Sequence, residues 1–125
     1  MLKLLNPASL EVKEDQNNSV ITRLDCYANS FLFSGDNSSA VEYALLKTNF
    51  DLSAQILKAS HHGSKTANSE VFLRAVSPVT YVISAGFGNR FGHPAPEVVE
   101  RAEAEGLNIF RTDKQGTIRI SGFIQ

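Results

Sequence analysis

The sequence predicts a single α/β (α+β) domain over residues 1–125, in which helices pack on one face of a mixed sheet. Three observations support this fold class. Short apolar runs typical of strands alternate with segments of helical periodicity. Hydrophobic residues make up 42% of the chain and charged residues 20%, the usual balance of a globular protein. No repeat, low-complexity segment or linker divides the sequence.

The first third of the chain predicts three strands. An apolar run over residues 2–5 is stopped by Asn6-Pro7, and the polar stretch 11–18 is typical of an exposed loop. Residues 20–24 and 31–33 carry β-type patterns, and the polar residues between them predict a turn. We therefore expect a β-hairpin here.

The middle of the chain predicts helix, strand and helix. Ser38 or Ser39 can cap the first helix, and Glu42 stands at the spacing of a capping box. Residues 55–58 form a short buried strand that leads into Ser-His-His-Gly-Ser at 60–64. Ser69 caps the second helix, whose inner face comprises Val71, Phe72, Leu73 and Val76.

The last third predicts a central strand, a helix and a second hairpin. Residues 79–84 are the most apolar run of the chain. Residues 97–105 predict a helix that ends at Gly106. Residues 108–111 and 117–120 read as the two strands of a hairpin, with Asp113 as a turn residue.

Charge, cysteine content and hydropathy narrow the function classes. The formal net charge is −1, so the sequence has no basic footprint typical of nucleic-acid or membrane-surface binding. Cys26 is the only cysteine; it can form no internal disulfide, and its apolar context predicts a buried, inert thiol. No membrane-spanning segment and no export signal is visible, which favours a cytoplasmic location.

Residues able to bind a metal follow three of the predicted strands. Asp36 follows the run 31–33, His61 and His62 follow the strand at 55–58, and His93 lies in the glycine-rich loop after residue 84. Sites in open α/β sheets form beyond the carboxyl ends of the strands. A carboxylate with several imidazoles suits a divalent metal such as zinc or manganese.

Each of these residues also has a structural interpretation. Asp36 could form a turn or favour a helix amino terminus. The His61–His62 pair could be a surface feature, and His93 an ordinary loop residue. Ser64 and Ser84 could suggest a nucleophile, but the sequence contains no Gly-x-Ser-x-Gly elbow, which argues against that chemistry.

The amino-acid sequences of five segments favour the metal-binding interpretation over the structural one. They are Ser-Gly-Asp at 34–36, Leu-Lys-Ala-Ser-His-His-Gly-Ser-Lys-Thr at 57–66, Ile-Ser-Ala-Gly-Phe-Gly-Asn-Arg-Phe-Gly-His-Pro at 83–94, Phe-Arg-Thr-Asp at 110–113 and Gly-Thr-Ile at 116–118. In this order they resemble the carboxyl-terminal half of the metallo-β-lactamase-like domain of the ComEC family of DNA-uptake competence proteins. The resemblance covers nearly the whole chain.

The resemblance implies the second half of an αββα sandwich and metal-assisted hydrolysis of a phosphodiester, with DNA as the substrate. By motif match, Asp36 would bridge two metals. One of His61 and His62 would be a terminal ligand and the other would face the substrate or support the site. The implied substrate-binding residues are Ser64, Lys65, Arg90 and His93.

One departure from the family pattern separates two hypotheses. The family's main metal motif, His-x-His-x-Asp-His, is absent from this sequence. The chain could be part of an enzyme whose amino-terminal half-domain comes from elsewhere, in which case it is expected to be inactive alone. Alternatively, it could be a non-catalytic module that binds a partner or a second copy of itself. Within a full competence protein the domain would lie outside the cytoplasm.

Overall fold

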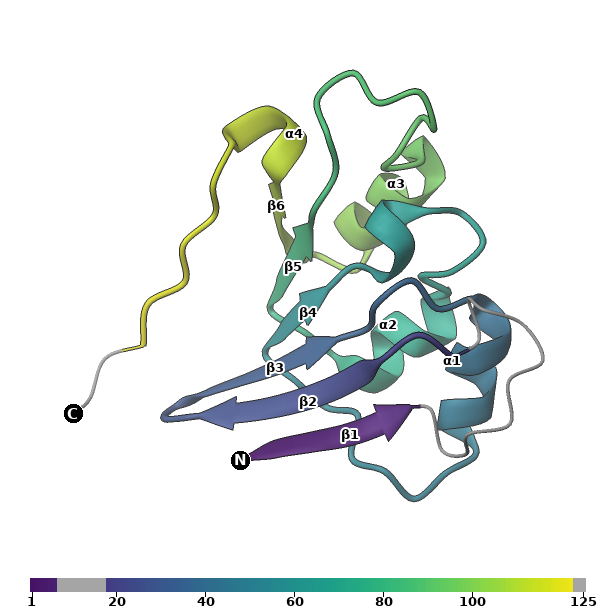
Figure 1. Cartoon of the computed structure of the whole chain (residues 1–125), viewed down its shortest axis with the longest axis vertical. Helices are drawn as coiled ribbons and strands as arrows, with labels where there is room; N and C mark the ends of the chain where they lie inside the picture. Colours follow the sequence, from purple (N-terminus) through teal and green to yellow (C-terminus); the bar gives the residue numbers. More distant parts are fainter. Residues whose placement is uncertain (7–17, 123–125) are drawn as a thin grey trace.

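The computed structural model describes residues 1–6 and 18–122, which form a six-stranded mixed sheet with helices against it (Figure 1). The strands, in their order across the sheet, are β1 (Leu2–Asn6), β2 (Ile21–Cys26), β3 (Asn29–Phe33), β4 (Ile56–Lys58), β5 (Thr80–Ile83) and β6 (Asn108–Arg111). The helices are α1 (Ser39–Leu46), α2 (Glu70–Val76), α3 (Pro96–Ala104) and α4 (Thr112–Gln115), and a short 3-10 segment, Ser60–Gly63, follows β4. The expected α+β class is confirmed.

The connections decide which strands are parallel. A two-residue turn joins β2 to β3, which therefore pair antiparallel, and β1 also pairs antiparallel with β2. The chain then passes through α1, α2 and α3 before β4, β5 and β6, and crossovers of this kind return the chain parallel to the preceding strand. As a result, the carboxyl ends of β3 to β6 lie along one edge of the sheet.

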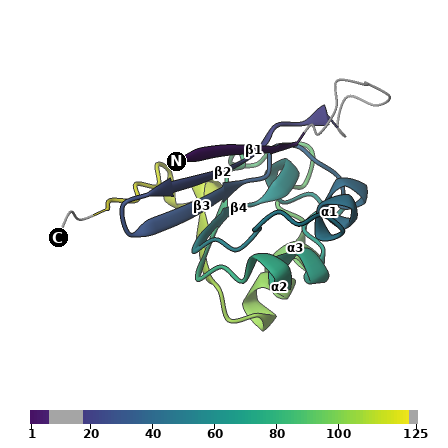
Figure 2. The same ribbon diagram turned by 90° about the horizontal axis from the view of Figure 1, so that it is seen from below.

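The two faces of the sheet differ in cover. Figure 2 shows α1, α2 and α3 together on one side, the inner face, with the carboxyl-terminal segment on the other. The alternation of a strand points every second residue to the helices. The core is built from sheet residues Leu5, Ile21, Leu32, Leu57, Tyr81 and Ile83 and helix residues Val41, Leu45, Phe72, Leu73, Val76, Val98 and Ala102.

The outer face carries a row of apolar side chains without a helix over it. Leu24, Phe31 and Ile56 pair across β2, β3 and β4, and Phe33, Val82 and Phe110 lie on the same face. Residues 117–122 run past this face and leave hollows of about 470 and 200 Å³ beneath Ile118 and Ile120.

Three expectations about elements are wrong. Residues 117–120 form no strand, because Thr112 bonds both backbone groups of Ala85 and the chain turns into α4 instead of a hairpin. Cys26 is exposed, since it ends β2 beside the hairpin turn and beyond the cover of the helices. Val71 is also exposed, while the other expected residues of α2 are buried.

The boundaries at Ser69 and Gly106 agree with the prediction, whereas Ser38 makes no side-chain cap bond at α1 and β3 begins at Asn29, inside the predicted turn. The Ser69 hydroxyl accepts a hydrogen bond from the Phe72 backbone N–H, so Ser69 caps α2. Gly106, with φ of 71°, terminates the turn after α3. Most of the polar stretch 11–18 lies outside the described residues. Among residues 1–6 and 18–122, no helix has both the length and the apolar character needed to cross a membrane.

Candidate functional site

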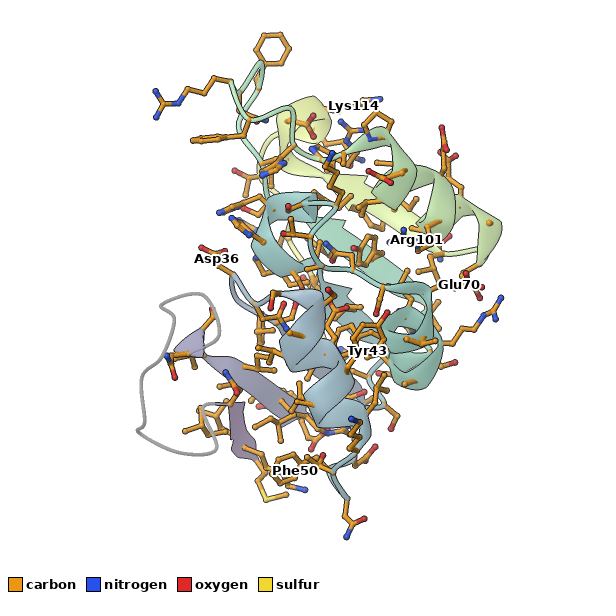
Figure 3. All side chains as sticks on the ribbon, turned by 90° about the vertical axis from the view of Figure 1, so that its right-hand side faces the viewer. Asp36, Tyr43, Phe50, Glu70, Arg101 and Lys114 are labelled. Atoms are coloured by element: carbon orange, nitrogen blue, oxygen red, sulfur yellow. The ribbon has the colours of Figure 1, made fainter. Side chains whose placement is uncertain are left out.

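The side chains with metal-binding chemistry gather at the carboxyl edge of the parallel strands. Asp36 lies at the surface of this edge (Figure 3), His61 and His62 follow β4, and His93 lies between β5 and α3. The ring centroids of His61 and His62 are 6.2 Å apart, and those of His61 and His93 are 5.8 Å apart. The strand pattern indicated this grouping, while the chemical roles of the four residues stay predictions.

His62 is oriented by a backbone carbonyl. Its Nδ1 lies 2.7 Å from the carbonyl oxygen of Ser84. A carbonyl can only accept, so Nδ1 donates its hydrogen, and in the neutral ring Nε2 carries the lone pair. Nε2 lies 3.6 Å from Oδ1 of Asp36. A metal-binding histidine usually donates the N–H of one ring nitrogen to an acceptor such as a backbone carbonyl, and the other ring nitrogen binds the metal.

The spacing between Asp36 and His62 can accommodate a cation. Two acceptors that face each other repel, unless a ring proton or a metal ion lies between them. Two ligands of one tetrahedral zinc, with bonds of about 2.0–2.2 Å, lie roughly 3.4 Å apart. The observed 3.6 Å therefore fits two ligands of a shared metal.

The pair by itself has too few ligands for a complete metal site. Within the described part of the chain, no group of three or more His, Cys, Asp or Glu side chains is placed to hold a metal ion. A catalytic zinc usually has three protein ligands and an open position. Further ligands would have to come from outside the described residues.

The two adjacent histidines adopt an unusual backbone conformation. His61 has φ 46° and ψ 49°, and His62 has φ 57° and ψ 23°, so both are left-handed. Gly63 follows with φ 82°. Left-handed residues other than glycine cost about 1–2 kcal/mol each, and such strain persists only where the surroundings hold it. The histidine turn, residues 61–63, is therefore held in place by neighbouring loops.

Two loops hold the histidine turn from opposite sides. The backbone N–H of His61 donates to the carbonyl of Gly35 at 2.8 Å, which joins the turn to the loop of Asp36. On the other side, Ala95 N–H donates to the carbonyl of Gly63 at 2.9 Å. A Cβ on Gly63 would lie only 2.6 Å from Cβ of Pro94, so the glycine allows this close approach.

A buried carboxylate on α1 also supports the histidine turn. The side chain of Glu42, on α1, is fully buried. It accepts hydrogen bonds from the backbone N–H groups of Asn68 at 2.6 Å and Ser69 at 2.9 Å, and from the Ser60 hydroxyl at 3.3 Å. The expectation of a capping-box role for Glu42 is wrong, because its oxygens are taken by the start of α2 and by the residue before the histidine turn.

Asn68 links Glu42 to the histidine turn. Its Oδ1 accepts from the backbone N–H of Ser60 and the hydroxyl of Tyr81, and its Nδ2 donates to the carbonyls of Ser60 and Ser64. Burial, together with the charge of Glu42, raises the pKa of Tyr81, so its hydroxyl stays protonated and donates. This network was not predicted from the sequence. The signal for it was a glutamate on the apolar face of a helix, because a buried charged residue needs hydrogen-bond partners.

His93 lies against the other two histidines. Asn89 holds its backbone, accepting from the His93 N–H at 3.0 Å and donating to its carbonyl at 2.5 Å. Burial, reinforced by the charges of His61 and His62, lowers the pKa of His93. Nδ1 of His61 is buried and has no hydrogen-bond partner among the described residues. These features favour a neutral imidazole at position 93.

The other predicted substrate-binding residues differ in their exposure to solvent. Lys65 and Arg90 are exposed, and the guanidinium carbon of Arg90 lies 5.0 Å from the ring centroid of Phe91. Ser64 is buried, and its hydroxyl lies 2.9 Å from that of Thr66. Of these three residues, Lys65 and Arg90 are therefore the ones that a ligand reaches without rearrangement.

Comparisons with known proteins identify relatives of this chain. No family model matches the chain. It is 30% identical over 116 residues to ComE operon protein 3 of Bacillus subtilis, which covers 93% of this chain and 15% of that protein. It is 35% identical over 118 residues to competence protein ComA of Neisseria gonorrhoeae, covering 94% of this chain and 17% of that one.

A third relative, Recombination protein 2 of Haemophilus influenzae, is 30% identical over 121 residues, covering 97% of this chain and 15% of that protein. The homologues of this chain are therefore proteins of DNA-uptake competence, the ComEC group. The chain spans about one sixth of the length of these relatives, so the activity of the whole proteins belongs to the proposals below.

Proposed function

We propose that this chain is the carboxyl-terminal half of a metallo-β-lactamase-like sandwich in a ComEC-like protein. In this proposal it contributes Asp36 and His62 to a metal-dependent phosphodiesterase site that acts on DNA. The remaining ligands would come from an amino-terminal half-domain with the His-x-His-x-Asp-His motif, which this sequence lacks. A zinc or manganese ion held there would polarise a phosphate oxygen and activate water.

The observation that carries the proposal is the oriented pair of His62 and Asp36. The Ser84 carbonyl holds Nδ1 of His62, so that Nε2 faces the carboxylate at 3.6 Å. The strained turn and the buried Glu42 network keep the His62 ring in this orientation at an exposed edge of the sheet. A histidine with a purely structural role would not need a fixed orientation there. Exposed Lys65 and Arg90 can each hold a phosphate oxygen of the substrate.

Metal titration tests the ligand assignment. Zinc and manganese binding is measured by calorimetry and by mass spectrometry of metal content on protein purified without chelator. We expect weak binding that is lost in Asp36→Ala and His62→Gln and retained in the neighbouring control His61→Gln. Equal loss in the control variant, or binding unaffected by all three changes, would refute the assignment.

Reconstitution tests the reaction. The chain alone is expected to be inactive, and metal-dependent cleavage of DNA is expected when a half-domain carrying the His-x-His-x-Asp-His motif is added. Asp36→Ala should abolish that cleavage because the shared carboxylate is lost. Full activity of the isolated chain would contradict the proposal.

The outer face of the sheet supports a second candidate function, that of a binding module. Phe31, Phe33 and Val82 lie on this face without a helix over them. We propose that the missing half-domain covers this face, since a sandwich places a second sheet there. A second copy of the chain in the same position would make it a self-associating module instead.

A further inference from the structure

Two phenylalanine rings are exposed on the loop that carries His93. Phe87 is 92% exposed and Phe91 is 67% exposed, and both belong to the glycine-rich loop between β5 and α3. Large apolar side chains exposed on one loop are typical of a contact surface. The histidine site proposed above does not use either ring.

The loop that carries these rings has a defined shape. The amide nitrogen of Asn89 donates to the carbonyl of Gly86 at 2.8 Å and to that of His93 at 2.5 Å, and its oxygen accepts from the His93 N–H. Gly88 and Gly92 take positive φ on either side of Asn89. The loop backbone is therefore held before any ligand arrives, which lowers the entropy cost of binding.

The surroundings of Phe91 combine an aromatic surface, a cation and a cavity. Its ring lies nearly parallel to the imidazole of His93, with 22° between the planes and 6.0 Å between the centroids. The Arg90 guanidinium lies over the Phe91 ring at 5.0 Å. A cavity of about 190 Å³ opens between the loop and the site, lined by His62, Ala85, Gly86, Asn89, Phe91 and His93.

This combination matches the chemistry of an unpaired nucleotide. Proteins that bind single strands offer an aromatic ring to the face of a base and a cation to the flanking phosphate. A base inside a duplex has both faces covered by its neighbours and cannot reach such a ring unless it is unstacked. Phe91 therefore suits a single-stranded substrate whose phosphate lies toward the histidine edge.

We propose that Phe91, assisted by Phe87, is a stacking platform for an unpaired nucleobase, so that the site takes single-stranded rather than duplex nucleic acid. The inference rests on the proposed phosphodiesterase function and deepens it by naming the form of the substrate. Phe91 and Phe87 are positioning residues in this account, because they hold the strand and do not touch the reacting phosphate.

The absence of tryptophan from the sequence provides a direct test. Phe91→Trp places a single tryptophan at the platform, and base stacking quenches its fluorescence. The chain is titrated with a short single-stranded oligothymidylate, with an abasic strand of equal length and with a duplex. We expect quenching by the oligothymidylate, and affinities weaker by about tenfold or more for the abasic strand and the duplex.

Substitutions that remove the ring complete the test. With a labelled oligothymidylate followed by anisotropy, Phe91→Ala should weaken binding by about tenfold, and Phe87→Ala by less. Phe50→Ala is the matched control: Phe50 is 44% exposed and lies at the end of the molecule away from this loop (Figure 3). Circular dichroism of each variant shows whether the fold is kept.

Three results would overturn the proposal. They are equal affinity for the abasic and base-carrying strands, no response to any strand, and a blue shift of the tryptophan emission with anionic phospholipid vesicles alone. The last would make the loop a membrane contact. None of these results affects metal binding by Asp36 and His62, so failure of the platform is distinguishable from failure of the proposed function.

Discussion

At the scale of single residues, the left-handed histidines depend on partners from several other segments. His61 is bonded to Gly35, Gly63 lies against Pro94, and Ser60 is held by Asn68 and Glu42. These contacts help to offset the conformational cost of the turn. Changes at the partners should therefore alter both stability and the orientation of His62.

Glu42→Gln is expected to lower the free energy of unfolding by about 1–3 kcal/mol. The amide would turn one donor group toward the N–H groups of Asn68 and Ser69 or the Ser60 hydroxyl, which leaves a buried polar group unsatisfied. Urea unfolding measures the change. Glu103→Gln, at an exposed position of α3, is the control and should stay within about 0.5 kcal/mol of the parent.

Gly63→Ala should be more destabilising than Gly106→Ala. Both glycines have positive φ, 82° and 71°, so both substitutions carry backbone strain. Only at Gly63 would the new Cβ also meet Pro94, and this overlap should add about 1–3 kcal/mol. Thermal unfolding of both variants gives the difference, and equal losses would mean that the contact with Pro94 is unimportant.

At the scale of elements, α4 closes the sheet edge beside the site. Thr112 bonds Ala85 at the end of β5, and Arg111 on β6 donates two hydrogen bonds to the carboxylate of Asp113. These side-chain bonds take the place of the hairpin that the sequence predicted. The stability of this corner should therefore depend on the charge of Asp113.

The hydrogen bonds from Arg111 lower the pKa of Asp113. Because the pKa is lower in the folded state, the ion pair stabilises the fold fully at pH values above the ordinary aspartate pKa of about 3.9. This contribution is lost as the pH falls through the folded-state pKa of Asp113. We expect Asp113→Asn to be less stable than the parent at neutral pH and equal to it in strong acid. Thermal unfolding across this range would contradict the ion pair if the difference stayed constant.

At the scale of the whole molecule, helices cover only one of the two faces of the sheet. The outer face exposes Phe33 and Phe110, and residues 117–122 cover it only in part. An apolar sheet face of this kind favours association. The protein is therefore expected to bind there either the half-domain proposed above or a second copy of itself.

Phe33→Lys should weaken this association, because it places a charge in the centre of the outer face. Light scattering across a concentration series, with and without the added half-domain, measures the mass of the assemblies. Tyr43→Lys, at an exposed aromatic position on α1, is the control and should leave association unchanged. A monomer under all conditions would count against the outer face as an interface.

The sequence by itself determined the alternation of strands and helices, the caps at Ser69 and Gly106, and the order in which Asp36, His61, His62 and His93 follow their strands. These features are local: periodicity, capping residues and glycines act over a few neighbouring positions. The strand ends could be expected to meet because crossovers make the strands parallel.

Only the tertiary structure decided which nitrogen of His62 is free, what Glu42 binds, and how the chain turns after β6. Each depends on residues distant in sequence: Ser84 lies 22 positions from His62, Asn68 lies 26 from Glu42, and Thr112 lies 27 from Ala85. Hydrogen bonds across such separations leave no periodic signal, because their geometry exists only after the helices have packed on the sheet.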